Sequence, residues 1–504
     1  MRARLKPLAL TMLISGCIAM PVLAATNQSL ETTVAKLQKE VAALKKSHAH
    51  ADDPVSSTAT KKNQNKNGNK RTVVQASTGT QFDLAQYLPF DVDVPGEAYV
   101  SSGPYIGVNV AFSGSNLIVT SPSVNTDLQL LNIRKKILTQ LGSLLGGEGN
   151  LKPEHSHVLL SGVIEGQASY TDFGGAPSRT DIDVTNMSLD TTIFGPSNWI
   201  LGFIELSYDN GTPMQSVFQS ASNYRTANSH VYVNKAFVTI GDLTKSPFYT
   251  TFGQFYVPFG TYSTVMVSDP LTKLVTRTKA RSIEIGMQQQ CDNAFYGSAY
   301  IFRGDTHANS VPKVNNGGIN LGYKFDLGYF TGNVGGGVIA SIADSGGMQL
   351  GTGFQFNEQI VHRVPGYNAR ATLSFGEHID LIGEWVTAST QFNPNDMSYN
   401  NHGAKPSAID LEASYSFPIF DNLPSSIGIG YGKTNEALAM GIPLTRTSVV
   451  FNTSLLRHTL QSLEFRHDRQ YAASDVATGA GNTTVISQNG KSDNAVTAQF
   501  DYYF

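Results

Sequence analysis

Charged residues are scarce in this chain of 504 residues, and cysteine and tryptophan are almost absent. Asp, Glu, Lys and Arg make up 15% of the sequence and the formal net charge is −3, a balance that argues against nucleic acid as a partner. Of the 2 cysteines, Cys17 lies in an amino-terminal apolar run, so Cys291 has no partner for an internal disulfide. Beyond the amino terminus there is no apolar run of helix-spanning length.

Enzyme and metal-binding motifs are missing as well. Gly432-Lys433-Thr434 and Gly490-Lys491-Ser492 resemble the end of a phosphate-binding loop, but an apolar residue occupies the position of the first glycine in each. Asp91-Val92-Asp93 begins like a calcium loop, yet Pro95 replaces a needed oxygen ligand. We therefore predict no enzymatic activity, no catalytic residue, no cofactor and no metal site.

Glycine and aromatic residues are abundant instead. The chain has 47 Gly, 21 Tyr and 26 Phe, which suits a wall whose outer face meets lipid and whose lumen is polar. A membrane protein without spanning helices has to be a closed barrel, because only closure satisfies every backbone group in lipid. We therefore predict an all-β transmembrane barrel.

Residues 1–24 are predicted to be a signal peptide. Basic residues at positions 2, 4 and 6 precede an apolar core from Leu8 to Met20, and Val22-Leu23-Ala24 offers a small-residue cleavage site. Ile14-Ser15-Gly16-Cys17 resembles a lipoprotein processing box, so lipidation of Cys17 is the alternative.

Two segments separate the signal from the folded part. Residues 25–46 carry a heptad seam, which predicts a short coiled coil and self-association; a lone amphipathic helix is the alternative. The seam consists of Leu30, Val34, Leu37, Val41 and Leu44. Residues 47–80 are rich in Lys, Asn, Ser and Thr, the composition of a disordered linker.

Residues 81–155 are predicted to form a small unit ahead of the barrel. Its main element is a helix over 125–145, which Asn125 can cap and whose positive end suits Asp127. An apolar stripe that includes Leu130 needs a surface to cover it. The unit therefore either plugs the lumen or lies in the periplasm.

Residues 156–504 contain about 16 alternating segments of the length of tilted membrane strands. After the first strand, long and short connections alternate. Short periplasmic turns and long outer loops are typical of a bacterial outer-membrane barrel, with both termini in the periplasm. The long connections, all expected outside, include 210–229, 258–278, 304–318, 343–365, 390–406 and 472–493.

The last nine residues have the pattern of a barrel-closing strand. Apolar and polar residues alternate, and Phe500, Tyr502 and Phe504 end the apolar face. We expect this strand to lie beside the first one, which brings Asp501 near Glu165 and leaves no free edge.

Strand alternation also assigns polar side chains to the lumen. Over 407–418, Leu411 and Tyr415 would face lipid, which leaves Asp410 and Glu412 inside. Charges of both signs across a lumen select solutes by size and dipole; the alternative is that they only pair with neighbours. The pore-lining candidates are Glu165, Gln167, Glu205, Lys324, Arg370, Asp380, Glu384, Asp410, Glu412, Arg446, Glu464, Arg466 and Asp501.

Three basic residues have the opposite parity. Arg277, Lys279 and Arg281 share a face with Ile283 and Ile285, which should meet lipid. At the extracellular end of a strand they would lie near lipopolysaccharide phosphates, so we predict contact with lipopolysaccharide or a loop role.

The order of features resembles one family, the LbtU outer-membrane siderophore porins of intracellular bacterial pathogens. The similar segments include Asp83-Leu84-Ala85-Gln86-Tyr87-Leu88-Pro89-Phe90, Gly103-Pro104-Tyr105-Ile106-Gly107, Leu160-Ser161-Gly162-Val163-Ile164-Glu165-Gly166 and Gly253-Gln254-Phe255-Tyr256-Val257-Pro258-Phe259-Gly260. The resemblance implies a 16-stranded barrel that takes up a ferric siderophore. Composition and periodicity carry no sign of iron specificity, and residues 25–80 contain no energy-transducing box. A general or anion-leaning diffusion porin and a surface adhesin or envelope anchor are the alternative functions.

Overall fold

The computed structural model describes residues 125–144 and most of residues 157–503. Within 157–503 it leaves out 195–196, 210–229, 292, 309–312, 356–357, 377, 420–422, 457–458 and 481–484. Before residue 125 it describes only the short strands β1 (Val74–Gln75), β2 (Gln81–Phe82), β3 (Val92–Val94), β4 (Ala98–Val100), β5 (Ala111–Ser113) and β6 (Asn116–Ile118). The predicted signal peptide, the coiled-coil seam and Phe504 lie outside the described residues.

Sixteen antiparallel strands form a closed barrel. In chain order they are β7 (His157–Asp172), β8 (Arg179–Phe194), β9 (Ile200–Asp209), β10 (His230–Gly241), β11 (Phe248–Tyr256), β12 (Lys279–Gln288), β13 (Ala294–Arg303), β14 (Val314–Asp326), β15 (Phe330–Ile339), β16 (Gly366–Phe375), β17 (Ile379–Ala388), β20 (Ser407–Ile419), β21 (Leu423–Asn435), β22 (Thr445–Thr453), β23 (Thr459–Arg469) and β26 (Ser492–Tyr503). The predicted fold class is confirmed.

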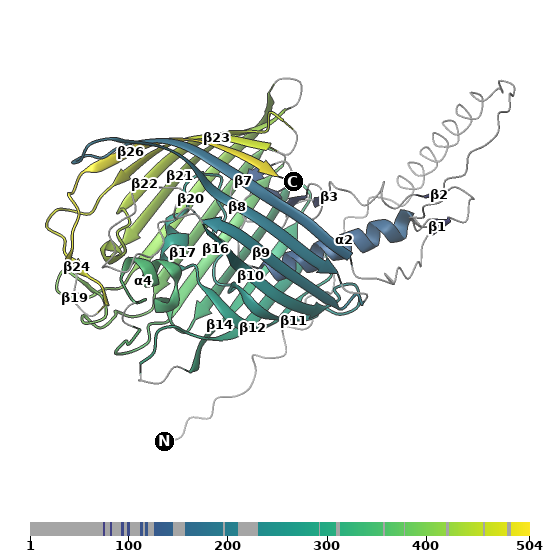
Figure 1. Ribbon diagram of the computed structural model, residues 1–504, viewed down its shortest axis with the longest axis horizontal. Coiled ribbons are helices and arrows are strands. Elements are labelled where there is room, and N and C mark those ends of the chain that lie inside the picture. The colour runs from purple at the N-terminus through teal and green to yellow at the C-terminus, as the bar shows by residue number, and fades with distance from the viewer. Residues whose placement is uncertain are drawn as a thin grey trace, which may run out of the picture. The chain divides into compact units, whose positions relative to one another are not determined.

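The last strand closes the wall. β26 pairs with β7, with Gln499 opposite Gln167 and Asp501 opposite Glu165, and Figure 1 shows it between β23 and β7. Phe500 and Tyr502 are half exposed on its outer face, whereas Asp501 is fully buried. Closure therefore leaves no unpaired edge in the barrel.

Side chains alternate between the two faces of the wall. In β12, Ile283 and Ile285 are 54% and 63% exposed, whereas Glu284 between them is 1% exposed. In β20, Leu411 and Tyr415 are exposed, whereas Glu412 and Ser414 are buried. The outer face is thus apolar and the inner face polar, as membrane barrels require.

Aromatic rings gather where the short turns join the strands. Ring centroids lie 4.5 Å apart for Phe295 and Tyr323, 5.1 Å apart for Phe325 and Phe330 and 4.7 Å apart for Phe330 and Phe375. These residues lie at one end of β13, β14, β15 and β16. An aromatic girdle at the rim is typical of a barrel that meets a membrane interface there.

The connection expected over 304–318 ends earlier, because β14 begins at Val314. The sequence Asn315-Asn316-Gly317-Gly318 has the composition of a turn. In the barrel Gly318 lies against the Tyr300 side chain, and a Cβ there would meet the Tyr300 hydroxyl at 2.4 Å. Gly318 therefore makes room for an inward aromatic ring inside a continuous strand.

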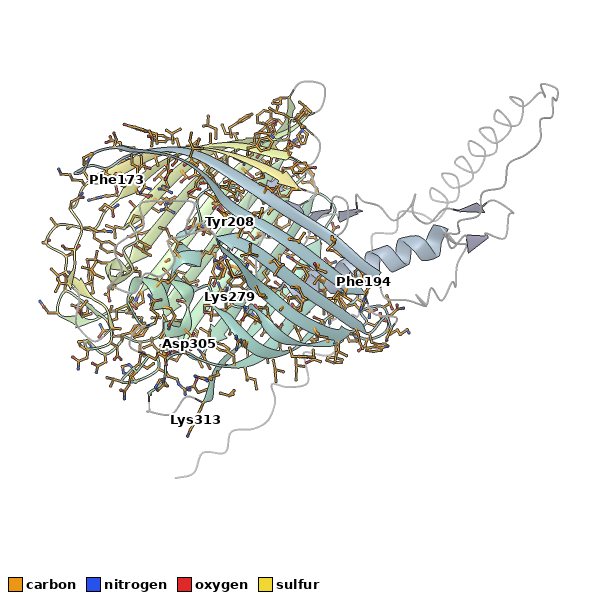
Figure 2. The ribbon with its side chains drawn as sticks, in the orientation of Figure 1. Phe173, Phe194, Tyr208, Lys279, Asp305 and Lys313 are labelled. Atoms are coloured by element: carbon orange, nitrogen blue, oxygen red, sulfur yellow. The ribbon has the colours of Figure 1, made fainter. Side chains whose placement is uncertain are left out.

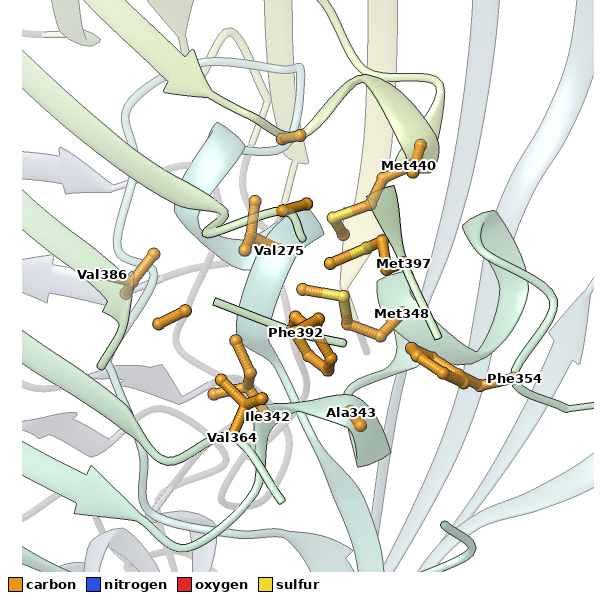
Figure 3. Close-up of a cluster of buried hydrophobic side chains, with 14 of the residues drawn as sticks. Val275, Ile342, Ala343, Met348, Phe354, Val364, Val386, Phe392, Met397 and Met440 are labelled. Carbon is orange, nitrogen blue, oxygen red and sulfur yellow. The ribbon is translucent and has the colours of Figure 1, made fainter. Parts of the chain in front are cut away.

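The long connections fold together at the opposite end. They contain α3 (Leu271–Thr276), η3 (Ile342–Asp344), α4 (Gly346–Gly351) and η4 (Leu438–Met440), and a four-stranded sheet of β18 (Ser398–Tyr399), β19 (His402–Gly403), β24 (Ala477–Thr478) and β25 (Val485–Ile486). Met348, Phe354, Phe392, Met397 and Met440 belong to one buried apolar cluster (Figure 3). The loops thus share a core of their own above the lumen.

Helix α2 (Thr126–Leu144) is one residue shorter at each end than predicted. Asn125 precedes it with a φ of 57°, and its carbonyl accepts a hydrogen bond from the Gln129 N–H at 3.0 Å. Asp127 lies in the first turn, where a negative charge suits the helix dipole. Among the described residues, none of the helices has the length and apolar character needed to cross a membrane.

Candidate functional site

The connection between β11 and β12 corrects one expectation from the sequence. Residues 258–278 were expected to be an outer loop, but they run into the barrel and contact the inner faces of β17, β20 and β23. We call this segment the inserted loop. It runs inward because wall carboxylates on those three strands offer acceptors for its backbone N–H groups.

The first half of the inserted loop is held by β17 and β20. The Glu384 carboxylate accepts hydrogen bonds from the N–H groups of Thr261 at 2.9 Å and Tyr262 at 2.8 Å. The Glu412 carboxylate accepts one from the Val265 N–H at 2.7 Å. Both carboxylates are nearly fully buried. Acceptors on two different strands therefore hold this half of the loop against the wall.

The second half is held in the same way. The Glu464 carboxylate on β23 accepts hydrogen bonds from the N–H groups of Val267 at 2.6 Å and Ser268 at 2.9 Å. The Asp410 carboxylate on β20 accepts one from the Leu271 N–H at 2.8 Å, where α3 begins. Four carboxylates among the pore-lining candidates therefore accept hydrogen bonds from backbone N–H groups of the loop.

Three alternating glycines of β21 give the loop its space. Gly428, Gly430 and Gly432 lie on the inner face of the strand. A Cβ at Gly428 would approach the Val265 side chain to 2.7 Å, and one at Gly432 would approach Leu271 to 2.9 Å. Without side chains at these positions, the loop can lie directly on the wall.

The inserted loop carries an ion pair of its own, Asp269–Lys273, which we call the loop ion pair. Burial alone would raise the pKa of Asp269, but Lys273 and Arg277 outweigh it and hold that pKa below its ordinary value. The Asp269 side chain is 39% exposed. The backbone carbonyl of Asp269 accepts a hydrogen bond from Arg446 on β22 at 2.9 Å. Arg446 in turn forms an ion pair with Asp468 at 2.8 Å. The loop ion pair is thus fixed in place, and the lowered pKa of Asp269 favours its ionised form.

A polar row on β7 and β26 lies within electrostatic reach of the loop ion pair. The charges of Asp269 and Lys273 act on Glu165, which belongs to this row and is half-buried on the inner face of β7. Gln167 donates to Glu165 at 3.1 Å and to Gln499 at 2.7 Å, and Gln499 donates to Asp501 at 2.9 Å. The loop ion pair and the polar row together place acidic, basic and amide groups around one part of the lumen.

The amino-terminal half of α2 packs against the inner wall at the short-turn end. Leu130 and Ile133 share a buried cluster with Phe203, Phe237 and Phe255 of β9, β10 and β11. A second cluster contains Leu128, Leu131, Leu243, Tyr249 and Tyr296. The apolar stripe expected on this helix therefore meets the aromatic inner face of neighbouring strands.

Polar contacts fix the same helix. The Thr251 hydroxyl donates to Asp127 at 2.6 Å, and the Arg134 guanidinium donates to the carbonyls of Gly241 and Ile200, the latter at 3.4 Å. Burial lowers the pKa of Arg134 to about 10, which leaves it charged at neutral pH. A charged donor on strand-end carbonyls ties α2 to the rim.

Cross-linking checks this docking. Asn132 and Gln288 exchange two side-chain hydrogen bonds of 3.1 Å, so cysteines at both positions, with Cys291 replaced by serine, should be joined in high yield by a short bismaleimide. The pair N132C/I285C should give no intramolecular product, because Ile285 faces outward on the same strand. Equal yields from the two pairs would mean that α2 does not hold this position.

The other pore-lining candidates occupy three settings. Glu205 forms a fully buried ion pair with Lys235 at 2.8 Å. Arg370 is buried and donates to Asn320 at 2.6 Å. Lys324, Asp380 and Arg466 lie on the inner face of β14, β17 and β23, with Asp380 buried and the other two half-buried. Most of these groups are bonded within the wall.

The three basic residues predicted on the outer face lie in different places. Arg277 ends α3 within the inserted loop, with its guanidinium 4.5 Å from the Tyr256 ring centroid. Lys279 donates to Asn234 at 3.1 Å. Arg281 is exposed and shares the outer face of β12 with Ile283.

Among curated proteins, the chain is 37% identical over 409 residues to a UPF0422 protein of Coxiella burnetii, which covers 80% of this chain and 84% of the relative. The chain belongs to the UPF0422 family. A UPF0422 protein of Legionella pneumophila is 37% identical over 423 residues, covering 80% of this chain and 76% of that one. No family model matches.

Solved structures similar to this UPF0422 member include two channels. An anion-selective porin from Comamonas acidovorans has a TM-score of 0.46 and 12% identity, covering 69% of this chain and 100% of the porin. The outer membrane channel DcaP of Acinetobacter baumannii has a TM-score of 0.44 and 13% identity, covering 70% of this chain and 98% of DcaP.

Three site residues of this UPF0422 member escaped the sequence reasoning: Lys235, Asp269 and Lys273. Lys235 lies in β10 beside a register shift, which changes the parity that assigns faces. Asp269 and Lys273 lie in a segment expected to be outside. The alternating glycines of β21 were the available signal for an inserted segment. Among the described residues there is no group of three or more side chains suited to a metal ion.

Proposed function

We propose that this chain is an outer-membrane channel through which a small polar solute passes between the inserted loop and the polar row on β7 and β26. The observation that carries the proposal is the inserted loop itself, which buried carboxylates hold inside the barrel. A fixed constriction with charges of both signs restricts solutes by size and dipole. The apolar outer face and the aromatic rim support placement in the outer membrane.

Within that class, we propose that the cargo is a ferric siderophore or a similar small iron chelate. The support is the family resemblance carried by segments such as Leu160–Gly166 and Gly253–Gly260. The test compares the parent strain, a deletion strain and the complemented deletion strain. It measures their uptake of radiolabelled ferric siderophore and of a small sugar. Loss of siderophore uptake alone supports the proposal. Unchanged siderophore uptake in the deletion strain contradicts it.

A general diffusion porin is the second candidate, because the same constriction also suits small unselected ions. Planar-bilayer recordings of the purified chain separate the two. A porin conducts salt steadily and shows little competition by the chelate, whereas a dedicated route is blocked by it. A barrel that stays silent even after removal of residues 82–150 would favour the adhesin or anchor alternative.

A further inference from the structure

Two adjoining hollows lie on the wall over β10–β13. One is an apolar slot of about 610 Å³, lined by Val233, Ala236, Phe252 and Ile283 among others. The other is a polar pocket of about 430 Å³, lined by residues that include Lys279, Arg281, Arg303 and Asp305. Gln254 and Arg281 line both hollows, so the slot leads into the pocket.

The slot is on the outer face, and the polar pocket is bordered by the exposed Arg281 and Arg303 of the same face, so the two hollows follow the polarity of a membrane. Val233, Phe252 and Ile283 are 46%, 47% and 54% exposed, as lipid-facing side chains are. The polar pocket lies at the strand ends that lead into long loops, and Figure 2 shows Lys279 and Asp305 on that side of the barrel. An apolar slot below a charged pocket matches acyl chains below a headgroup.

The slot owes its shape to an irregularity in the sheet. The register of β10 shifts between Val233 and Lys235, and the Gln254 amide donates to the freed carbonyls of Val233 at 3.0 Å and Asn234 at 3.2 Å. A bulge bends a strand and opens the packing beside it. Because the Gln254 amide N–H group binds those carbonyls, its oxygen is directed to Arg281, whose Nε lies 3.5 Å away.

The pocket contains more cationic groups than its neighbours neutralise. In the part of the chain that the structure describes, neither Arg281 nor Arg303 forms an ion pair with a carboxylate. The Asp344 carboxylate in the same pocket already accepts hydrogen bonds from Thr306 and Asn316. Asp305 is the exposed carboxylate there. Guanidinium groups match phosphate in a two-pronged geometry, so two of them beside one hollow suit a phosphate group.

We propose that these hollows form a binding site for a phosphorylated, acylated lipid of the outer leaflet. Arg281 and Arg303 bind a phosphate oxygen each, and one acyl chain lies in the slot along Ala236 and Phe252. The site rests on the placement of the barrel in the outer membrane and not on any solute passing through the lumen, so conductance and lipid binding can fail separately.

The test uses the full chain, purified in detergent, with lipid A as the probe and phosphatidylcholine and inorganic phosphate as comparison ligands, measured by native mass spectrometry. The double variant R281Q/R303Q should bind lipid A about tenfold more weakly or worse, the factor expected for the loss of a charge-assisted hydrogen bond. Ala236→Phe, which fills the slot, should weaken lipid A binding without changing phosphate binding. The matched control R469Q removes an exposed arginine at the long-loop end of β23 and should bind normally.

The proposal is wrong if the native chain binds lipid A no better than phosphatidylcholine. It is also wrong if R469Q loses as much affinity for lipid A as R281Q/R303Q. If inorganic phosphate competes as well as lipid A and Ala236→Phe has no effect, the site is a simple anion pocket. The proposed binding of an acyl chain in the slot is then wrong. Heat-dependent gel mobility verifies that each variant is folded. If the double variant does not fold, R281Q and R303Q are compared singly with R469Q, and each should still bind lipid A more weakly than that control.

Discussion

A variant with Glu412 and Glu464 both replaced by alanine is expected to conduct several-fold more current than the native barrel. These carboxylates accept hydrogen bonds from Val265, Val267 and Ser268 of the inserted loop. Each buried N–H group left without an acceptor costs roughly 1–3 kcal/mol, so the loop no longer gains from lying on the wall. Without these two anchors, the middle of the loop leaves the wall although Glu384 and Asp410 still hold its two ends, and single-channel recordings should show a larger and noisier open state.

The control for this experiment is Ser462→Ala. Ser462 is buried on the inner face of β23, two residues from Glu464, and its hydroxyl forms no hydrogen bond. The control should therefore conduct like the native chain. Native conductance in the double variant, with the barrel still folded on a gel, would mean that the inserted loop does not limit the passage.

The largest loss of stability is expected from Lys235→Met. Lys235 and Glu205 form an ion pair at 2.8 Å with both side chains fully buried. Removing one partner leaves an uncompensated buried charge, a change that costs about 3–5 kcal/mol. Lys235 also donates to Thr126, the first residue of α2, at 3.4 Å. The variant should unfold at a clearly lower temperature. The measurement is the temperature at which the barrel loses its heat-resistant migration on a gel.

The pair can be tested as a unit. Replacing Glu205 by Gln and Lys235 by Met together removes both charges of the pair, and part of the lost stability should return. The recovery should be incomplete, because the fully buried Asp190 lies opposite Glu205 on β8 and also loses its cationic neighbour. Asn234 still has an acceptor, since its amide binds the Glu205 carboxylate and a glutamine oxygen can replace it. A single variant as stable as the native barrel would show that the ion pair contributes little.

The wall of the barrel was predictable because its pattern is local. Alternation along a strand depends on neighbouring residues, and Leu411, Glu412 and Ala413 indicate their faces from sequence alone. The inserted loop was not predictable in this way. Its partners lie far along the chain, with Thr261 bonded to Glu384 and Ser268 bonded to Glu464, which are 123 and 196 residues away.

The candidate site shows the same division. Alternation predicts that Glu384 and Asp410 point inward, but the atoms that they bind depend on where a distant loop runs. Parity also failed beside the register shift in β10, where Lys235 lies inside although strict counting from Val231 would place it outside. Irregular backbone and long-range contacts thus account for what the sequence pattern left open.

The anchors of the inserted loop have a consequence for the order of assembly. The loop follows β11, but every carboxylate that holds it belongs to β17, β20 or β23, which come later in the chain. Contacts between distant residues form slowly, because a long stretch of chain must be closed before they can be made. A nascent barrel that ends at β16 therefore has no acceptor for Tyr262 or Val265, and the passage narrows only once the last strands arrive.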